Sequence, residues 1–170
     1  MADLALHLNV LPVEQAREAL TRCCAAARWV EAMLTRRPFA SPAAVLSAAS
    51  EEWAQLSRTD YLEAFAHHPE IGANLEQLRQ KFGSTAAWAS SEQSGAANAS
   101  EATLLALQAG NAAYRARFGY SFIVCASGKS AQQMLALLQA RLDHAPEQEL
   151  YVAAAEQAKI THLRLEKLTT

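Results

Sequence analysis

Apolar residues in the first part of the chain recur at steps of three and four, and this spacing constrains the fold more than any other feature. A helix places such residues on one face, so they predict a buried helical stripe that continues until Pro38 ends the segment. Alternating strand patterns are nearly absent, and alanine and leucine dominate. We therefore predict an all-α fold, a single domain over residues 1–170 with about eight or nine helices. The stripe consists of Val13, Ala16, Leu20, Cys23, Ala27, Val30 and Leu34.

Capping residues and prolines place the next boundaries. Ser41, followed by a proline, suits the N-cap of a helix that runs to about residue 56. Thr59 or Asp60 is expected to cap a shorter helix after it. That helix must stop near residue 67, because the residue before Pro69 is steered out of helical geometry.

The second half of the chain is also predicted to be helical, with one exception. Short helices are expected over about 74–81 and 85–96, and a capping-box pattern at 98–101 opens a long helix that Gly119 ends. The β-branched and aromatic run 122–125 predicts a short extended segment. Two more helices should begin after Ser130 and at Pro146.

Charge and cysteine content limit the partners and the compartment. The formal net charge of −2 provides no basic field, so we expect neither nucleic acid nor a membrane surface as a partner. No apolar run has spanning length and no leader pattern is recognisable, so we expect a protein that is neither membrane-embedded nor exported. The three cysteines do not form a disulfide framework, which favours a reducing compartment. A cytoplasmic protein is expected.

His68 is the first candidate for chemistry because it directly precedes Pro69. The proline fixes the backbone at a helix end, where an imidazole can be held toward a cavity. An imidazole with a pKa of roughly 6.5 both gives and takes protons near neutral pH. The alternative for the pair His67–His68 is one surface side chain and one that hydrogen-bonds a helix end.

Glu92 is the second candidate. Small and apolar neighbours surround it in sequence, which leaves room for a ligand as readily as for close helix packing. A carboxylate beside His68 would fix the imidazole tautomer and stabilise its protonated form. The alternative is a solvated helix residue.

The run Phe122–Ala126 is the third candidate, through its backbone. An extended segment in a helical protein has N–H groups that no helix consumes, and these can bind a planar, amide-rich ligand. The alternative is a core connector, which the apolar side chains fit equally well.

Several polar residues border apolar stripes in the remaining helices. Arg164 can cap the end of the last helix or grip a substrate carboxylate, and Arg141 is a weaker candidate for the same task. A buried Asn111 needs hydrogen-bond partners, and a structural bond to a neighbouring loop is the better interpretation. Glu149 suits the dipole at the start of the last helix.

In their order and spacing these residues resemble the family of 2-oxo-4-hydroxy-4-carboxy-5-ureidoimidazoline (OHCU) decarboxylases, which complete urate breakdown to (S)-allantoin. The resemblance extends over nearly the whole chain, and no single motif carries it. It rests on Cys23-Cys24, Arg28-Trp29, Arg37-Pro38-Phe39, His68-Pro69-Glu70-Ile71-Gly72, Glu92-Gln93, Asn111, Tyr114, Phe118-Gly119, Phe122-Ile123, Gly128, Ile160 and Leu163-Arg164-Leu165.

The resemblance implies an all-α enzyme for a small-molecule substrate that needs no metal or organic cofactor and often forms homodimers. It makes His68 the essential histidine and Glu92 its acidic companion. Ala89 stands where the family commonly has serine, and Ser90 or Ser91 is considered as the replacement. The residues implied to line the substrate site are Pro69, Ala89, Ser90, Ser91, Gln93, Phe122, Ile123, Val124, Cys125, Ala126 and Arg164.

Two other classes of protein remain open. A non-catalytic helical adaptor would bind a partner through an exposed groove, and composition alone allows it. A metal hydrolase would use His68, Glu92 and either His144 or His162, but the irregular spacing of these residues disfavours a metal site.

Overall fold

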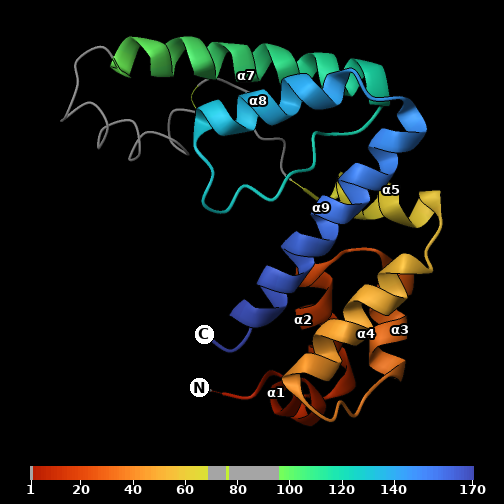
Figure 1. Cartoon of the computed structure of the whole chain (residues 1–170). Helices are drawn as coiled ribbons and strands as arrows, with labels where there is room; N and C mark the ends of the chain where they lie inside the picture. The colour runs from red at the N-terminus through yellow and green to blue at the C-terminus, as the bar shows by residue number, and fades with distance from the viewer. Residues whose placement is uncertain (1, 69–75, 77–95) are drawn as a thin grey trace. The chain divides into compact units, whose positions relative to one another are not determined.

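The computed structural model describes residues 2–68, 76 and 96–170, with the backbone alone for 96–100, and this part of the chain is all-α (Figure 1). It contains eight helices and no strand, which confirms the predicted class. The helices expected over about 74–81 and 85–96 lie outside the described residues. The helices are α1 (Leu4–Val10), α2 (Val13–Cys23), α3 (Ala27–Thr35), α4 (Pro42–Ala54), α5 (Arg58–Ala66), α7 (Ala96–Phe118), α8 (Ala131–Leu142) and α9 (Pro146–Lys167).

The chain divides into two compact units. The first comprises residues 1–67 and 154–170, and the second comprises residues 68–153. Helix α9 therefore contributes its opening turns to the second unit and the remainder to the first. A single domain over residues 1–170 stays a prediction.

In the first unit, the stripe predicted to be continuous is split into α2 and α3, so that prediction is wrong. Cys24 and Ala26 have extended backbone and are buried between the two helices. The carboxylate of Glu63 on α5 accepts a hydrogen bond from the N–H of Ala27, the first residue of α3. A side chain distant in sequence thus satisfies a helix start that local spacing does not reveal.

Two buried tryptophans connect α4 to its neighbours in this unit. The Trp29 indole N–H donates to the Ala49 carbonyl over 3.1 Å, which joins α3 to α4. The Trp53 indole N–H donates to the Ala154 carbonyl over 2.9 Å, which joins α4 to α9. Each indole buries its apolar body and still satisfies its one donor, so the core of the first unit contains no orphaned indole N–H.

The start of α5 differs from the prediction, whereas its end agrees. Ser57 is the N-cap, and Asp60 lies three residues into the helix as the acidic member of a capping box. The Asp60 carboxylate accepts hydrogen bonds from the Ser57 N–H over 3.0 Å and from Arg28 over 3.1 Å. Its role as the carboxylate of the box explains why Asp60 is buried and is not the cap. The helix ends at Ala66, as the proline at position 69 requires.

Helix α1 was missed in the sequence. The Asp3 carboxylate caps it by accepting a hydrogen bond from the Leu6 N–H over 2.9 Å. Leu4 and Leu8, one turn apart, are both buried. The helix has only seven residues, which is too short for a periodic pattern of apolar residues to identify it.

In the second unit, α7 and α8 lie side by side and run in the same direction, because residues 119–130 carry the chain back between them (Figure 1). The helices approach closely at Gly110, where a Cβ atom would lie 2.5 Å from a methyl carbon of Leu138. Positive φ angles at Gly119 and Gly128 turn the backbone at the two ends of the return segment.

Of the three helix starts that the structure describes in this unit, two agree with the predictions. Ser130 caps α8 through a capping box with Gln133, and α9 begins at Pro146. Helix α7 begins at Ala96, ahead of the capping-box pattern at 98–101, so that predicted start is wrong. The high helix propensity of alanine is sufficient to extend the helix through the capping-box pattern.

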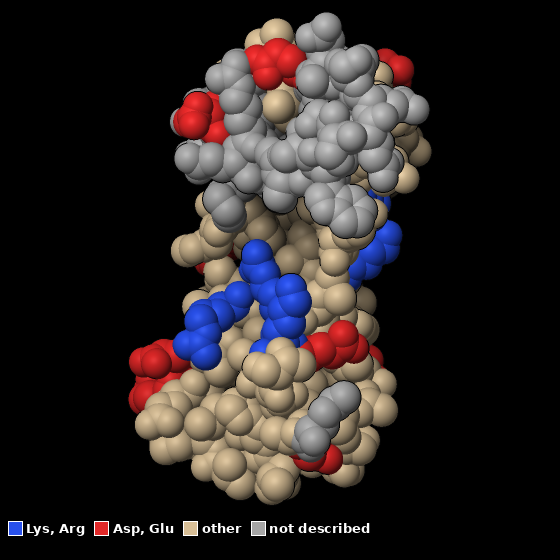
Figure 2. Space-filling view, turned by 90° about the vertical axis from the view of Figure 1, so that its left-hand side faces the viewer, with Lys and Arg blue, Asp and Glu red and all other residues tan. Residues whose placement is uncertain are grey.

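The surface carries charges of both signs. Figure 2 shows one face of the molecule, on which basic side chains gather in a limited area with acidic side chains on either side of it. Among the described residues, the helices are either too short or too polar to cross a bilayer.

Asp60→Asn should lower the free energy of unfolding by about 1 kcal/mol at neutral pH, because the capping box loses its carboxylate. The pKa of Asp60 lies below its ordinary value of 3.8, chiefly because the carboxylate accepts the Ser57 N–H bond. Its stabilisation is therefore present above that ordinary value and is lost as the pH falls through the lower pKa of the folded state.

Urea unfolding of both proteins at pH 7 and at pH 3 tests this prediction. The difference between wild type and Asp60→Asn should shrink at pH 3, and an unchanged or larger difference would contradict it. Asp143→Asn, an exposed position at the end of α8, is the matched control and should differ little from wild type at either pH.

Candidate active site

The segment Phe122–Ala126 belongs to no helix or strand, and it is buried except at Ala126, which is half-buried. The four side chains from Phe122 to Cys125 are each exposed by 8% or less. Among the hydrogen bonds within the described residues, none has the N–H of Phe122, Ile123, Val124 or Ala126 as its donor. Buried N–H groups without partners are costly, so this backbone is suited to a ligand that supplies acceptors.

Two basic side chains hold the carbonyls of this segment. Arg141 of α8 donates from Nη1 to the Ile123 carbonyl over 2.7 Å. Lys129 donates from Nζ to the Cys125 carbonyl, also over 2.7 Å. The Arg141 guanidinium also lies over the Phe122 ring, with its central carbon 4.5 Å from the ring centroid. Charge-assisted bonds of this kind are stronger than neutral ones and fix the backbone they bind.

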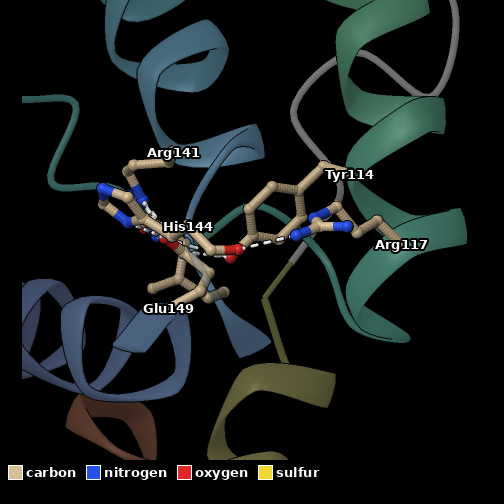
Figure 3. Close-up of polar contacts among 6 residues, drawn as sticks. Tyr114, Arg117, Arg141, His144 and Glu149 are labelled. Atoms are coloured by element: carbon tan, nitrogen blue, oxygen red, sulfur yellow. Dashed lines mark hydrogen bonds and ion pairs between the residues drawn. The ribbon is translucent and has the colours of Figure 1, made fainter. Parts of the chain in front are cut away.

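Glu149 in turn holds Arg141, as Figure 3 shows. Arg141 Nε donates to Glu149 Oε2 over 2.9 Å, and the Tyr114 hydroxyl donates to the same oxygen. His144 Nδ1 lies 3.0 Å from Glu149 Oε1. The Glu149 side chain is fully buried and that of Arg141 is 6% exposed. Removing one member of a buried ion pair typically costs about 3–5 kcal/mol, because the other charge is left buried and unpaired, so truncation of either side chain should destabilise the second unit.

Tyr114 is a neutral donor in this network. Burial, followed by the hydrogen bond to Glu149, raises the pKa of the Tyr114 hydroxyl well above its ordinary value. Its ring also packs edge-on against the Phe122 ring, with centroids 5.3 Å apart. Tyr114 therefore contacts both the anchoring carboxylate and the segment itself.

The sequence pattern gave these residues other roles. Arg141 was predicted as a weaker substrate ligand, but its guanidinium is occupied by Glu149 and the Ile123 carbonyl. Glu149 does lie in the first turn of α9, yet it is buried in an ion pair, which a dipole role does not require. The sequence does contain one indication that Arg141 is buried. Arg141 follows Leu138 by three residues and so falls on the buried stripe of α8.

Asn111 forms a structural hydrogen bond, but with a different partner from the one expected. Its Nδ2 donates over 2.8 Å to the Leu107 carbonyl, one turn earlier in α7. The prediction of a bond to a neighbouring loop is therefore wrong. A buried amide can be satisfied by its own helix, because side chains of Asn reach the carbonyl four residues back.

His68 follows the end of α5 and is half-buried, whereas its neighbour His67 is exposed. The position of His68 just after the end of α5 agrees with the sequence analysis. Its pairing with Glu92 stays a prediction, because Pro69, Ala89, Ser90, Ser91, Glu92 and Gln93 lie outside the described residues.

Arg164 is partly exposed on α9 and belongs to the first unit. Its Nη1 donates to the Arg22 carbonyl over 3.5 Å, and within the described residues it forms no ion pair. Burial raises the pKa of the nearby Cys23 thiol to about 12 and that of Cys24 to about 11, so neither sulfur is an anionic partner. Among the described residues, the Arg164 guanidinium therefore has no anionic partner.

The histidines of the metal-hydrolase alternative have other contacts. His162 Nε2 lies 2.9 Å from the Ser50 hydroxyl, and His144 contacts Glu149. Where the structure describes the chain, no three His, Cys, Asp or Glu side chains gather in an arrangement that could hold a metal ion.

The described parts thus define a class: an all-α protein with a buried irregular segment whose carbonyls are held by basic side chains. Residues 9–166 match the family model for OHCU decarboxylase. The chain therefore belongs to the OHCU decarboxylase family, as the resemblance in the sequence predicted.

Individual relatives agree with this assignment. The chain is 38% identical over 148 residues to the "Uric acid degradation bifunctional protein TTL" of Arabidopsis thaliana, covering 86% of this chain and 45% of that protein. It is 30% identical over 138 residues to the 2-oxo-4-hydroxy-4-carboxy-5-ureidoimidazoline decarboxylase of Haloferax volcanii, covering 81% and 79% of the two chains. The chain thus spans less than half the length of the Arabidopsis protein.

Solved structures show the same fold. A crystal structure of OHCU decarboxylase in the presence of (S)-allantoin superposes with a TM-score of 0.69 at 37% identity, covering 89% of this chain and 96% of that one. A crystal structure of (S)-allantoin synthase superposes with a TM-score of 0.70 at 22% identity, covering 96% and 53%, and supports the fold alone.

Proposed function

We propose that this protein is a carboxy-lyase that decarboxylates OHCU to (S)-allantoin in urate degradation. Family membership over residues 9–166 supports the reaction class. The observation that carries the proposal is the segment Phe122–Ala126. Among the described residues, the N–H groups of Phe122, Ile123, Val124 and Ala126 have no hydrogen-bond acceptor, so they suit a planar ligand rich in carbonyl oxygens. The substrate and its product are both of that kind.

The reaction requires little from the protein, since the substrate contains its own electron sink. The bond between the carboxylate carbon and the ring carbon breaks, and its electron pair flows into the adjacent ring C=N bond to give an enol-like intermediate. Carbon dioxide leaves, and protonation on one side gives the S product. The protein must orient the carboxylate perpendicular to the ring and stabilise the developing charge with fixed dipoles.

The predicted site residues divide these tasks. The N–H groups of Phe122–Ala126 bind and orient the ring, and Arg164 is the residue proposed to bind the substrate carboxylate. His68, oriented by Glu92, transfers the hydroxyl or ring proton. Pro69, Gln93 and one of Ser90 and Ser91, beside Ala89, complete the wall of the site.

The finer parts of the proposal concern cofactor, compartment and assembly. Neither a metal nor an organic cofactor is needed, because the imine of the substrate accepts the electrons. Three buried cysteines, none of which forms a disulfide, suit a reducing, cytoplasmic compartment. The resemblance to the family supports a homodimer, and sedimentation as a monomer at working concentrations would refute that assembly.

A direct assay tests the function. Urate is oxidised freshly to generate the unstable substrate, the protein is added, and circular dichroism follows the chirality of the allantoin formed. Spontaneous decay yields racemic product, so accumulation of the S enantiomer reports the enzyme. Racemic product in the presence of folded protein would remove the proposed function and favour a non-catalytic adaptor.

His68→Asn should reduce the rate of (S)-allantoin formation by roughly 10²–10⁴, the usual contribution of a general acid–base group. The matched control is His67→Asn, which changes the exposed neighbouring histidine and should leave the rate near wild type. Initial rates in the dichroism assay, with far-ultraviolet dichroism to verify folding, provide the measurement. Near-wild-type stereoselective activity in folded His68→Asn would show that another group transfers the proton.

Removal of metal ions should leave activity unchanged. Protein dialysed against a chelator and assayed in metal-free buffer should match the undialysed enzyme in rate and in enantiomeric excess. A loss of activity that added zinc or another divalent ion restores would instead show that the enzyme requires a metal ion.

A further inference from the structure

We propose that Arg141 and Lys129 are positioning residues that fix the substrate-binding backbone of Phe122–Ala126, with Glu149 fixing Arg141. This inference deepens the proposed function and rests on it, since it takes the segment as the place where the ring binds. Neither basic residue is proposed to touch the substrate.

The geometry places one cation on each of two carbonyls in the segment. Arg141 binds the Ile123 carbonyl and Lys129 binds the Cys125 carbonyl, each over 2.7 Å. These carbonyls are two residues apart, the spacing at which an extended backbone directs its groups to one side. The N–H groups of Phe122 and Val124 would then face the opposite side, away from the two cations.

The segment needs such anchors because no ladder or helix holds it. Within the described residues, its backbone makes a single hydrogen bond to other backbone, from the Lys129 N–H to the Ala126 carbonyl over 3.1 Å. Preorganised donors are effective only if they need not move when the ligand arrives. Anchoring of the carbonyls through side chains provides this rigidity, and the N–H groups of Phe122 and Val124 have no acceptor among the described residues.

Glu149 makes the Arg141 anchor rigid. It accepts from Arg141 Nε and Nη2, while Tyr114 and His144 contact the same carboxylate. The third guanidinium nitrogen, Nη1, donates to the segment. Lysine carries the same charge at this position but cannot bind Glu149 and the Ile123 carbonyl with a planar fork.

Arg141→Lys and Lys129→Met test the proposal, with Arg117→Lys as the matched control. Arg117 also donates to a backbone carbonyl in this unit, that of His144 over 2.8 Å, but it does not reach the segment. For each folded variant, kcat and KM are measured in the dichroism assay, and the Kd of (S)-allantoin is measured by isothermal titration calorimetry.

Both test variants should raise KM and the Kd of (S)-allantoin by about tenfold, the effect of one lost hydrogen bond to a charged group, with kcat little changed. Arg117→Lys should match wild type. A variant that merely lowers the folded fraction would reduce the apparent kcat and leave KM and Kd unaltered. Wild-type KM and Kd in both test variants, or loss of kcat alone, would overturn the proposal.

The two measurements also separate this inference from the proposed function. If wild type yields only racemic allantoin but binds (S)-allantoin, the decarboxylase proposal fails and the Kd values still decide the role of Arg141 and Lys129. If wild type shows neither turnover nor allantoin binding, both proposals fail. If Arg141→Lys does not fold, the partly exposed Lys129→Met decides the outcome alone.

Discussion

The ion pair and hydrogen bonds of the buried Glu149 carboxylate are the interactions on which the second unit depends. It contacts Tyr114 of α7, Arg141 of α8 and His144 in the turn after α8. These contacts join the three residues to the first turn of α9. A buried charge is tolerated only when it is paired and hydrogen-bonded, and here the pairing also determines a geometry. With its guanidinium fixed, Arg141 holds the Ile123 carbonyl and thereby the segment.

This arrangement explains how a chain of plain helices can provide a polar site. Helices consume their own backbone groups, so N–H donors for a ligand must come from backbone outside them. We propose that the return segment between α7 and α8 is that backbone, and the side chains of Phe122–Cys125 are buried in the unit. Donors fixed in a place of low water content favour a reaction in which charge moves from a carboxylate into a ring.

The sequence predicted those features of the fold that local chemistry determines. Ser41 and Ser130 cap their helices because a serine hydroxyl binds a free N–H wherever a helix starts. Helix α5 ends beside His68 since a proline follows, and the aromatic run near Phe122 leaves the helical pattern as expected.

Features that depend on distant partners were not predicted. The break between α2 and α3 relies on Glu63, thirty-six residues beyond Ala27. The burial of Glu149 relies on Arg141 and Tyr114, and an acidic residue in a first helical turn is usually at the surface. For the candidate site, the segment and His68 are predictions from the sequence, whereas the contacts of Arg141 and Lys129 with the segment became evident only from the structure.

A crystal structure of this protein bound to (S)-allantoin would test the central claim most directly. The account predicts that ring or ureido oxygens of the ligand accept hydrogen bonds from N–H groups of Phe122–Ala126, while Arg141 and Lys129 still hold the carbonyls behind them. Allantoin bound elsewhere, with those N–H groups unengaged, would contradict the account.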